Sequence, residues 1–201
     1  MESTTEIENS GLVNTLKGKP GYLPCQYIEM ALAEGLIHSK TPIERSQIQP
    51  VSLDLRIGTR AYRIQCSFLP ENEAVENKLK EISLYEFDIS NGGILEKNAI
   101  YLIPLMEELN LPSSFYGLAN PKSSTGRLDM FTRVIVDGGH RFDEIPRGYS
   151  GNLFLEVIPR SFPVKVRTGL SLNQLRVAHV TSYTLGKQGL EIKYKNNPIL
   201  F

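Results

Sequence analysis

Cysteines and long apolar runs are scarce in this sequence. Cys25 and Cys66 are its only cysteines, too few for a disulfide framework and too far apart for a paired metal-ligand motif. No apolar stretch approaches the length needed to cross a bilayer, and Met1 to Ser10 is polar and acidic, unlike a secretion leader. These absences predict a cytoplasmic protein without a membrane span, in which both thiols are ordinary packed side chains.

Net charge is also absent, because 22 basic side chains balance 22 acidic ones. Without a net field, nothing draws the chain to nucleic acid or to a membrane surface. The G-x-x-x-x-G-K-[ST] spacing of a P-loop is missing, which disfavours an ATPase or kinase of that type. The three histidines are scattered, and none stands in the H-x-E plus P-C-x-x-C arrangement of zinc nucleobase deaminases. Any phosphate binding must therefore be local, and we expect no zinc.

The length and composition predict one packed domain. The chain has 201 residues, of which 41% are hydrophobic, enough for a single core and short for two. Residues 1–21 mix polar, glycine and proline positions without periodicity, so we predict a flexible N-terminal arm there and a single domain over 22–201. Apolar residues at helical spacing predict a short helix over 24–34, with Gly35 as its stop.

The rest of the chain has mostly the patterns of short strands. Residues 51–57 alternate apolar and polar side chains, and Gly58-Thr59 leads into 61–64, which predicts a β-hairpin. Residues 71–81 are charged and fit a surface helix or an insertion loop, while 95–105 fits strand, turn and strand. Further strands are expected at 115–119, 131–136, 153–158, 164–167 and 174–180. The spacing is typical of a mainly β sandwich or barrel with a few short helices.

Hydroxyls and cations are densest in the segment from Asn120 to Arg127. Pro121 ends a strand, and Ser123 and Ser124 stand at an expected helix start. Their hydroxyls, nearby backbone N–H groups and the flanking cations suit phosphate oxygens. The alternative is that a serine caps a short helix while the arginine binds a nearby carboxylate.

Two further segments have the composition of a binding or catalytic site. Glu156 lies inside the apolar run Leu153 to Ile158, and a buried carboxylate is costly unless it is partnered or is used for proton transfer. A structural ion pair is the alternative reading. Gly138 and Gly139 follow a strand end and would let a ligand ring approach the backbone, or would simply form a turn.

Taken together in chain order, these segments resemble the metal-independent dCTP deaminases of the dUTPase-like superfamily. The matching segments are 50–58, 120–129, 140–143 and 148–156, and the resemblance covers 22–180. It is closest to the amino-terminal domain of long-form 2'-deoxycytidine 5'-triphosphate deaminases, in which N-P-K-S-S-T-G-R-L-D, a G-Y-x-G strand ending in Glu, and P-R-[ST]-F follow one another. The resemblance implies a dUTPase-like distorted jelly-roll or β-barrel, assembled as a homotrimer with active sites between subunits.

The function that the resemblance implies is hydrolysis of the amidine C–N bond of dCTP, giving dUTP and ammonia for dTTP precursor synthesis. Glu156 falls on the carboxylate that activates water, with Ser123 and Arg127 as its catalytic companions. The nucleotide-binding positions are Lys122, Ser124, Gly138, Gly139, Arg141 and Asp143. Mg²⁺ would be bound through the triphosphate and not by a protein site, and dTTP is an expected inhibitor.

Two other functions stay open on the sequence alone. The shared fold allows a dUTP pyrophosphatase, alone or combined with deamination, in which Asp143 positions the water at the phosphates. Long-form relatives carry a second domain of the same kind, so a nucleotide-binding or assembly module without turnover is the other alternative. Lys122 stands where shorter relatives often carry Arg, which keeps the charge but loses the bidentate fork.

Overall fold

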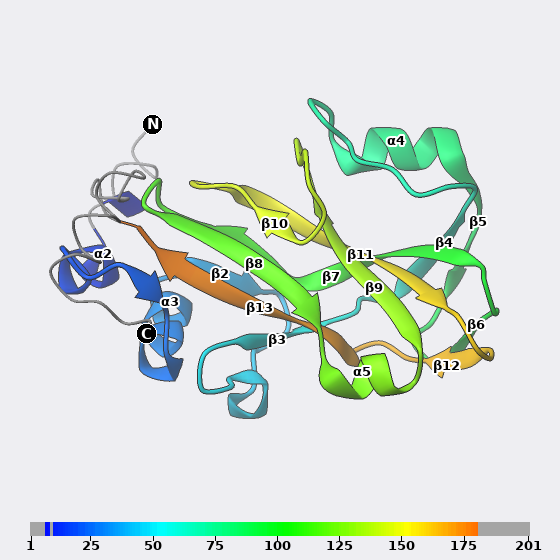
Figure 1. Ribbon diagram of the computed structural model, residues 1–201, viewed down its shortest axis with the longest axis horizontal. Coiled ribbons are helices and arrows are strands. Elements are labelled where there is room, and N and C mark those ends of the chain that lie inside the picture. Colours follow the sequence, from blue (N-terminus) through cyan, green and yellow to red (C-terminus); the bar gives the residue numbers. More distant parts are fainter. Residues whose placement is uncertain (1–6, 9, 181–201) are drawn as a thin grey trace, which may run out of the picture.

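The computed structural model describes residues 7, 8 and 10–180, and they form a mainly β fold (Figure 1). One five-stranded sheet, called sheet A, has the order β1-β13-β8-β10, with β3 also paired to β13. Its strands are β1 (Gly21–Tyr22), β3 (Leu53–Arg56), β8 (Phe115–Pro121), β10 (Glu144–Ile145) and β13 (Ser171–His179).

The second sheet, sheet B, has six strands in the order β5-β4-β7-β11-β9, with β2 also paired to β7. Its strands are β2 (Ile37–Ser39), β4 (Arg60–Ile64), β5 (Ser83–Asp88), β7 (Ile100–Asn110), β9 (Met130–Val136) and β11 (Ser150–Pro159). The short strands β6 (Gly93–Leu95) and β12 (Val164–Val166) form a separate pair. Neither sheet closes on itself, and the predicted mainly β class with a few short helices is confirmed.

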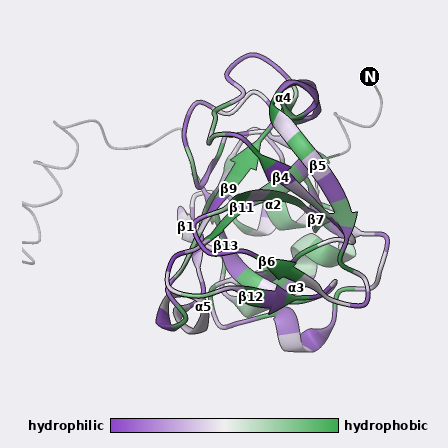
Figure 2. Cartoon of the chain, turned by 90° about the vertical axis from the view of Figure 1, so that its right-hand side faces the viewer, coloured by the Kyte–Doolittle hydropathy of each residue, from purple (hydrophilic) through white to green (hydrophobic). Residues whose placement is uncertain are grey.

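The two faces of sheet B are buried against different clusters. On β11, Leu153, Leu155 and Val157 belong to the main core, which also takes in buried side chains of sheet A. Phe154 belongs to a second cluster with Val75 of α4 (Val75–Ile82). This helix lies on the outer side of sheet B, beside β4 and β5 (Figures 1 and 2). Because alternate residues of a strand share a face, Glu156 lies on the face of this second cluster.

The predicted hairpin over 51–64 is wrong. β3 pairs with β13 in sheet A, whereas β4 pairs with β5 and β7 in sheet B. Between them, a Cβ on Gly58 would lie 2.8 Å from the carbonyl oxygen of Pro104, so the chain passes close to β7 here. All four side chains of β3 are buried, including Asp54 and Arg56. The polar positions of this alternating segment therefore have internal partners, and the alternation alone could not show which strand is adjacent to β3.

Residues 10–21 fall within the predicted flexible N-terminal arm, and a helix and a strand of this segment contact the domain. The helix α2 (Gly11–Thr15) starts at Ser10, whose side chain accepts from the Val13 N–H. Leu12 is fully buried in the core, and its N–H donates to Glu34 Oε1 at 3.0 Å. β1 then pairs with β13. The helix is too short to show a helical period in the sequence, but the buried side chains of Leu12 and Leu16 attach it to the core.

The other local predictions agree with the structure. α3 (Cys25–Ala33) is the helix expected over 24–34, and α4 shows that the charged segment near 71–81 is largely helical. The five strands expected from 115 onward are β8, β9, β11, β12 and β13, and β6 and β7 bracket the turn expected within 95–105. The remaining short helices are η1 (Arg45–Gln47) and α5 (Ser123–Arg127). Among the described residues, no helix combines the length and apolar character of a membrane span.

Candidate active site

Glu156 is paired across two strands of sheet B with an arginine that the sequence reading had not singled out. Glu156 on β11 stands opposite Arg133 on β9. Both Nε and Nη2 of Arg133 donate to Oε1 of Glu156, at 2.9 and 2.6 Å. The Glu156 side chain is 0% exposed and the Arg133 side chain 23%. Oε2 of Glu156 is buried and has no hydrogen-bond partner in the part of the chain that the structure describes. The carboxylate is thus charge-compensated through one oxygen, while the other is left available.

The Arg133 guanidinium is held by three further groups. Its Nη2 donates to Ser67 Oγ at 2.5 Å. Its carbon lies 3.6 Å from the centre of the Phe142 ring and 4.9 Å from that of Phe131, which are cation–π distances. A guanidinium contacted by rings and a hydroxyl has little freedom to turn, so the oxygen of Glu156 that it binds is fixed as well.

Asp143 completes this group with a second carboxylate. It has a positive φ of 63°, which aspartate tolerates better than most residues. Its Oδ1 accepts from the Val134 N–H at 2.8 Å. Burial raises the pKa of Asp143, and the nearby Glu156 charge acts in the same direction, whereas the Val134 N–H and the Arg133 charge lower it. Asp143 therefore lies close enough to the Arg133–Glu156 pair for both of their charges to act on it.

The predicted phosphate segment forms α5, beside the start of β9. Ser123, Ser124 and Arg127 are exposed, while Thr125 is buried and its hydroxyl donates to the Leu172 carbonyl at 2.8 Å. No hydrogen bond or ion pair within residues 7, 8 and 10–180 joins these three exposed side chains to Glu156. Thr125 anchors the turn of helix, and its neighbours project into solvent.

A hollow of about 520 Å³ lies between α5 and the strand face that carries Glu156. It is lined by Gly126, Asp129, Met130, Phe131, Ile158 and Arg160. Phe131 and Ile158 share a strand face with Arg133 and Glu156, since alternate residues of a strand point the same way. The hollow therefore continues the face of the ion pair toward the phosphate segment.

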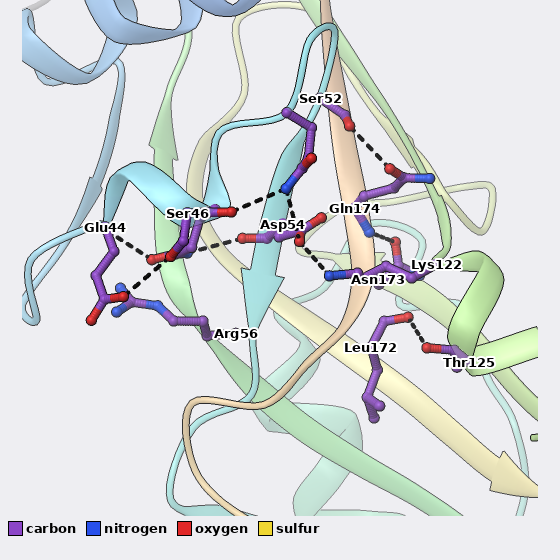
Figure 3. Close-up of polar contacts among 12 residues, drawn as sticks. Glu44, Ser46, Ser52, Asp54, Arg56, Lys122, Thr125, Leu172, Asn173 and Gln174 are labelled. Atoms are coloured by element: carbon purple, nitrogen blue, oxygen red, sulfur yellow. Dashed lines mark hydrogen bonds and ion pairs between the residues drawn. The ribbon is translucent and has the colours of Figure 1, made fainter.

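Lys122, at the start of α5, is tied to sheet A (Figure 3). Its ammonium group pairs with Oδ2 of Asp54 on β3, and its N–H donates to the Leu172 carbonyl at 3.0 Å. Asp54 is 5% exposed. Because Lys122 already has a buried counter-ion, we assign it first to fixing the head of α5, and phosphate contact by Lys122 stays a prediction.

Gly138, Gly139 and Arg141, which the sequence predicts to bind nucleotide, have other contacts in the described chain. The Gly138 N–H donates to the Glu73 carbonyl at 3.0 Å, and the Gly139 carbonyl accepts from the Glu71 N–H at 3.2 Å. Arg141 is exposed and pairs with Glu144 at 3.2 Å. Arg141 also lines a different hollow, of about 580 Å³, beside Tyr116, Leu118 and Ile145. Asp143 is the one of these four predicted nucleotide-binding residues that lies near the Glu156 group in the described chain, and nucleotide contact by Gly138, Gly139 and Arg141 stays a prediction.

Arg133 gave one signal that sequence reasoning could have used. It stands in Met130 to Val136, an apolar strand, much as Glu156 stands in its own apolar run. Two opposite charges in two buried strands invite pairing, but only the cross-strand register shows that these two face each other. Ser67 and Phe142 gave no such signal, because their roles depend on where Arg133 lies.

Comparison with known proteins gives consistent matches. The family model described as the 2'-deoxycytidine 5'-triphosphate deaminase N-terminal domain matches residues 19–181. A dCTP deaminase of Acidianus ambivalens is 29% identical over 130 residues, covering 64% of this chain and 68% of the relative. A dUMP-forming dCTP deaminase of Sulfurihydrogenibium sp. (strain YO3AOP1) is 31% identical over 160 residues, covering 74% of this chain and 78% of the relative.

A solved structure agrees with these sequence matches. The crystal structure of 2'-deoxycytidine 5'-triphosphate deaminase from Agrobacterium tumefaciens superposes with a TM-score of 0.78 at 42% identity. The match covers 89% of this chain but 54% of that one, so the chain spans about half the length of the Agrobacterium protein.

Proposed function

Because this chain belongs to the family of 2'-deoxycytidine 5'-triphosphate deaminases, we propose that it converts dCTP and water to dUTP and ammonia with Glu156 as the general base. The observation that carries the proposal is the state of this carboxylate. Its Oε1 is bound by Arg133, while its buried Oε2 has no partner among the described residues. A buried, charge-compensated carboxylate with one unengaged oxygen is suited to take a proton from water.

The reaction exchanges the amino group on C4 of cytosine for an oxygen from water, and the protein has only to transfer protons around this carbon. Oε2 takes a proton from the water whose oxygen forms a bond to C4 of cytosine. The two protons of that water end on N3 and on the departing amino group, and the C4–N4 bond then breaks to release ammonia and leave a carbonyl at C4. Glu156 accepts each proton from the attacking oxygen and passes it to N3 or to the departing amino group, and no metal is needed for these steps. Since Glu156 is 0% exposed, side chains packed on this face must shift to admit the ring.

The triphosphate would be held by α5. The hydroxyls of Ser123 and Ser124 and the guanidinium of Arg127 are exposed and hydrogen-bond or pair well with phosphate oxygens. Mg²⁺ would bring charge neutralisation to the triphosphate, with phosphate oxygens and water as its ligands. The described residues offer no cluster of three or more acidic, histidine or cysteine side chains for a metal of their own.

The proposed base can be tested directly. Purified protein is incubated with dCTP and Mg²⁺, and ammonia and the nucleotide product are quantified. Glu156→Gln should lower kcat by roughly 10²- to 10⁴-fold while dCTP affinity is kept. Arg127→Ala should lower turnover and should in addition weaken triphosphate binding. Glu86→Gln, an exposed glutamate of β5, is the matched control and should leave both quantities unchanged. Full activity in Glu156→Gln would show that another group is the base.

We further propose a homotrimer in which α5 of one subunit serves Glu156 of its neighbour. Exposed side chains on α5 without a bond to the Glu156 group support this arrangement. If it holds, mixing the impaired Glu156→Gln and Arg127→Ala proteins under conditions that allow subunit exchange should restore about a quarter of the sites of a random trimer. If each site is built within one subunit, the mixture is no more active than the two proteins kept apart.

Pyrophosphate release from dUTP is the second candidate activity. Asp143 favours it, because this half-buried carboxylate lies near the Arg133–Glu156 pair, and the Sulfurihydrogenibium relative is named dUMP-forming. The product separates the two activities. dUTP as the end product rejects the second candidate, whereas dUMP and pyrophosphate support a combined enzyme. Nucleotide binding that survives Glu156→Gln, with no turnover in the parent protein, would favour a non-catalytic module.

A further inference from the structure

The contact between Arg133 and Glu156 is one-sided. A fork-to-fork pair places one guanidinium nitrogen on each carboxylate oxygen. Here Nε and Nη2 both donate to Oε1, at 2.9 and 2.6 Å, and Oε2 receives no hydrogen bond from any residue that the structure describes. The geometry therefore distinguishes the two oxygens of a side chain that would otherwise be free to exchange them.

The guanidinium is itself fixed from several directions. Ser67 accepts from Nη2 at 2.5 Å, and the Phe142 ring lies 3.6 Å from the guanidinium carbon. The two strands that carry the pair are in register, with Arg133 directly opposite Glu156. A turn of the Glu156 carboxylate would break both charge-assisted bonds to a partner that cannot follow. The orientation of Oε2 is thus a consequence of how Arg133 is held.

Charge compensation through one oxygen has a chemical consequence. A carboxylate with 0% exposure is unfavourable without a compensating charge or hydrogen bonds. Arg133 supplies the charge entirely at Oε1, so Oε2 can meet water or the base edge without being needed for stability. Asp143, the other acidic group of this site, has its Oδ1 engaged by the Val134 N–H. It is Arg133, and not Asp143, that determines how Glu156 points.

We infer that Arg133 is the positioning residue of the deamination site, holding Oε1 of Glu156 so that Oε2 faces the reacting base. The inference rests on the proposed function and goes beyond it. Arg133 is assigned no contact with reacting atoms, since its Nε and Nη2 donate to Oε1 of Glu156 and to Ser67. Replacing Arg133 should therefore lower kcat and leave nucleotide binding unchanged.

The experiment compares Arg133→Ala and Arg133→Lys with the parent protein in steady-state dCTP deamination. Misplacing a catalytic group costs on the order of 10²-fold in rate, so we expect kcat of Arg133→Ala to fall by about that factor while KM changes little. Arg133→Lys should regain part of the loss, because an ammonium can reach Oε1 but lacks the planar fork. Free guanidinium ion, added below denaturing concentrations, should raise kcat of Arg133→Ala.

Arg63→Ala is the matched control. Arg63 lies in the same sheet, contacts the Tyr101 ring at 5.7 Å and donates to backbone carbonyls of Ile64 and Ile100. It thus resembles Arg133 in size, charge and aromatic contact, but makes no bond to Glu156. Its variant should keep the parent kcat and should not respond to guanidinium.

The outcomes separate the inference from the function on which it rests. A parent protein that does not deaminate dCTP overturns the proposed function itself. An active parent with unchanged kcat in Arg133→Ala, or with a raised KM at unchanged kcat, overturns the positioning role. Should Arg133→Ala fail to fold by thermal melting, Arg133→Lys decides by the same criterion, because it keeps the charge: a lowered kcat at constant KM supports the inference, and parent kinetics reject it.

Discussion

Asp143 is a half-buried carboxylate near the fully buried Glu156, and at the residue scale this has a consequence for stability. Burial raises its pKa above the usual aspartate value, with the charge of Glu156 adding to the rise. The native state therefore binds a proton more tightly than the unfolded chain does. The stability that comes from this protonation is present below the unfolded pKa and is lost as the pH rises through the raised one.

We expect Asp143→Asn to gain stability over the parent at pH 7, because the amide avoids burial of a charge while its Oδ1 still accepts from Val134. The gain should disappear below about pH 4, where the aspartate is protonated in both states. Urea unfolding at pH 7 and pH 4 measures the difference. Asp88→Asn should instead lose stability relative to the parent at pH 7, because the Ser90 N–H lowers the pKa of this exposed carboxyl and so favours its charged form in the folded state. This loss should shrink as the pH falls and Asp88 becomes protonated. An equal difference at both pH values would contradict the argument for Asp143.

At the scale of elements, the short helix α2 shows how little sequence is needed to attach a segment to the core. Leu12 is 0% exposed. Leu12→Ala should lower the free energy of unfolding by about 2–5 kcal/mol, because it removes buried methyl groups and leaves a cavity. Leu84→Ala is the control, as Leu84 is 54% exposed on β5, and it should change stability by about 0.5 kcal/mol or less. Urea unfolding of both variants checks this, and equal values would mean that α2 is not part of the cooperative fold.

At the scale of the whole molecule, a buried ion pair joins the two sheets. Glu107 on β7 of sheet B accepts at Oε1 from Arg56 Nε and at Oε2 from the Arg56 N–H, both at 2.7 Å, and Arg56 belongs to β3 of sheet A. Gln47 adds a bond to Oε1 at 3.1 Å. The pair therefore links the two sheets at the end of β3, where the chain passes into sheet B and does not form the predicted hairpin.

Glu107→Gln should cost about 3–5 kcal/mol of unfolding free energy, because Arg56 would keep its charge in a buried place without a counter-ion. The exposed pair of Arg60 and Glu86 is the comparison, with side-chain exposures of 53% and 47%. There, Glu86→Gln should cost about 0–1 kcal/mol. Chemical unfolding at neutral pH measures both. Similar costs for the two variants would show that the inter-sheet pair contributes no more than a surface contact.

The sequence by itself determined what depends on neighbours along the chain. Short apolar runs separated by turn residues predicted β8, β9, β11, β12 and β13, though not the two-residue strand β10, and helical spacing predicted α3, because these signals extend over only a few residues. The order of four motifs indicated the family, and the apolar run around Glu156 identified it as a buried carboxylate. Each of these conclusions needed no knowledge of which segments are adjacent in space.

Tertiary structure decided the pairings between distant residues. Arg133 and Glu156 are 23 positions apart, Arg56 and Glu107 are 51 apart, and neither separation has a local signature. The alternation of 51–57 specified a strand, but the partner of β3 depends on packing between the sheets. The same holds for the two oxygens of Glu156: a sequence can place a carboxylate in a strand, while only the arginine opposite it determines which oxygen is left for chemistry.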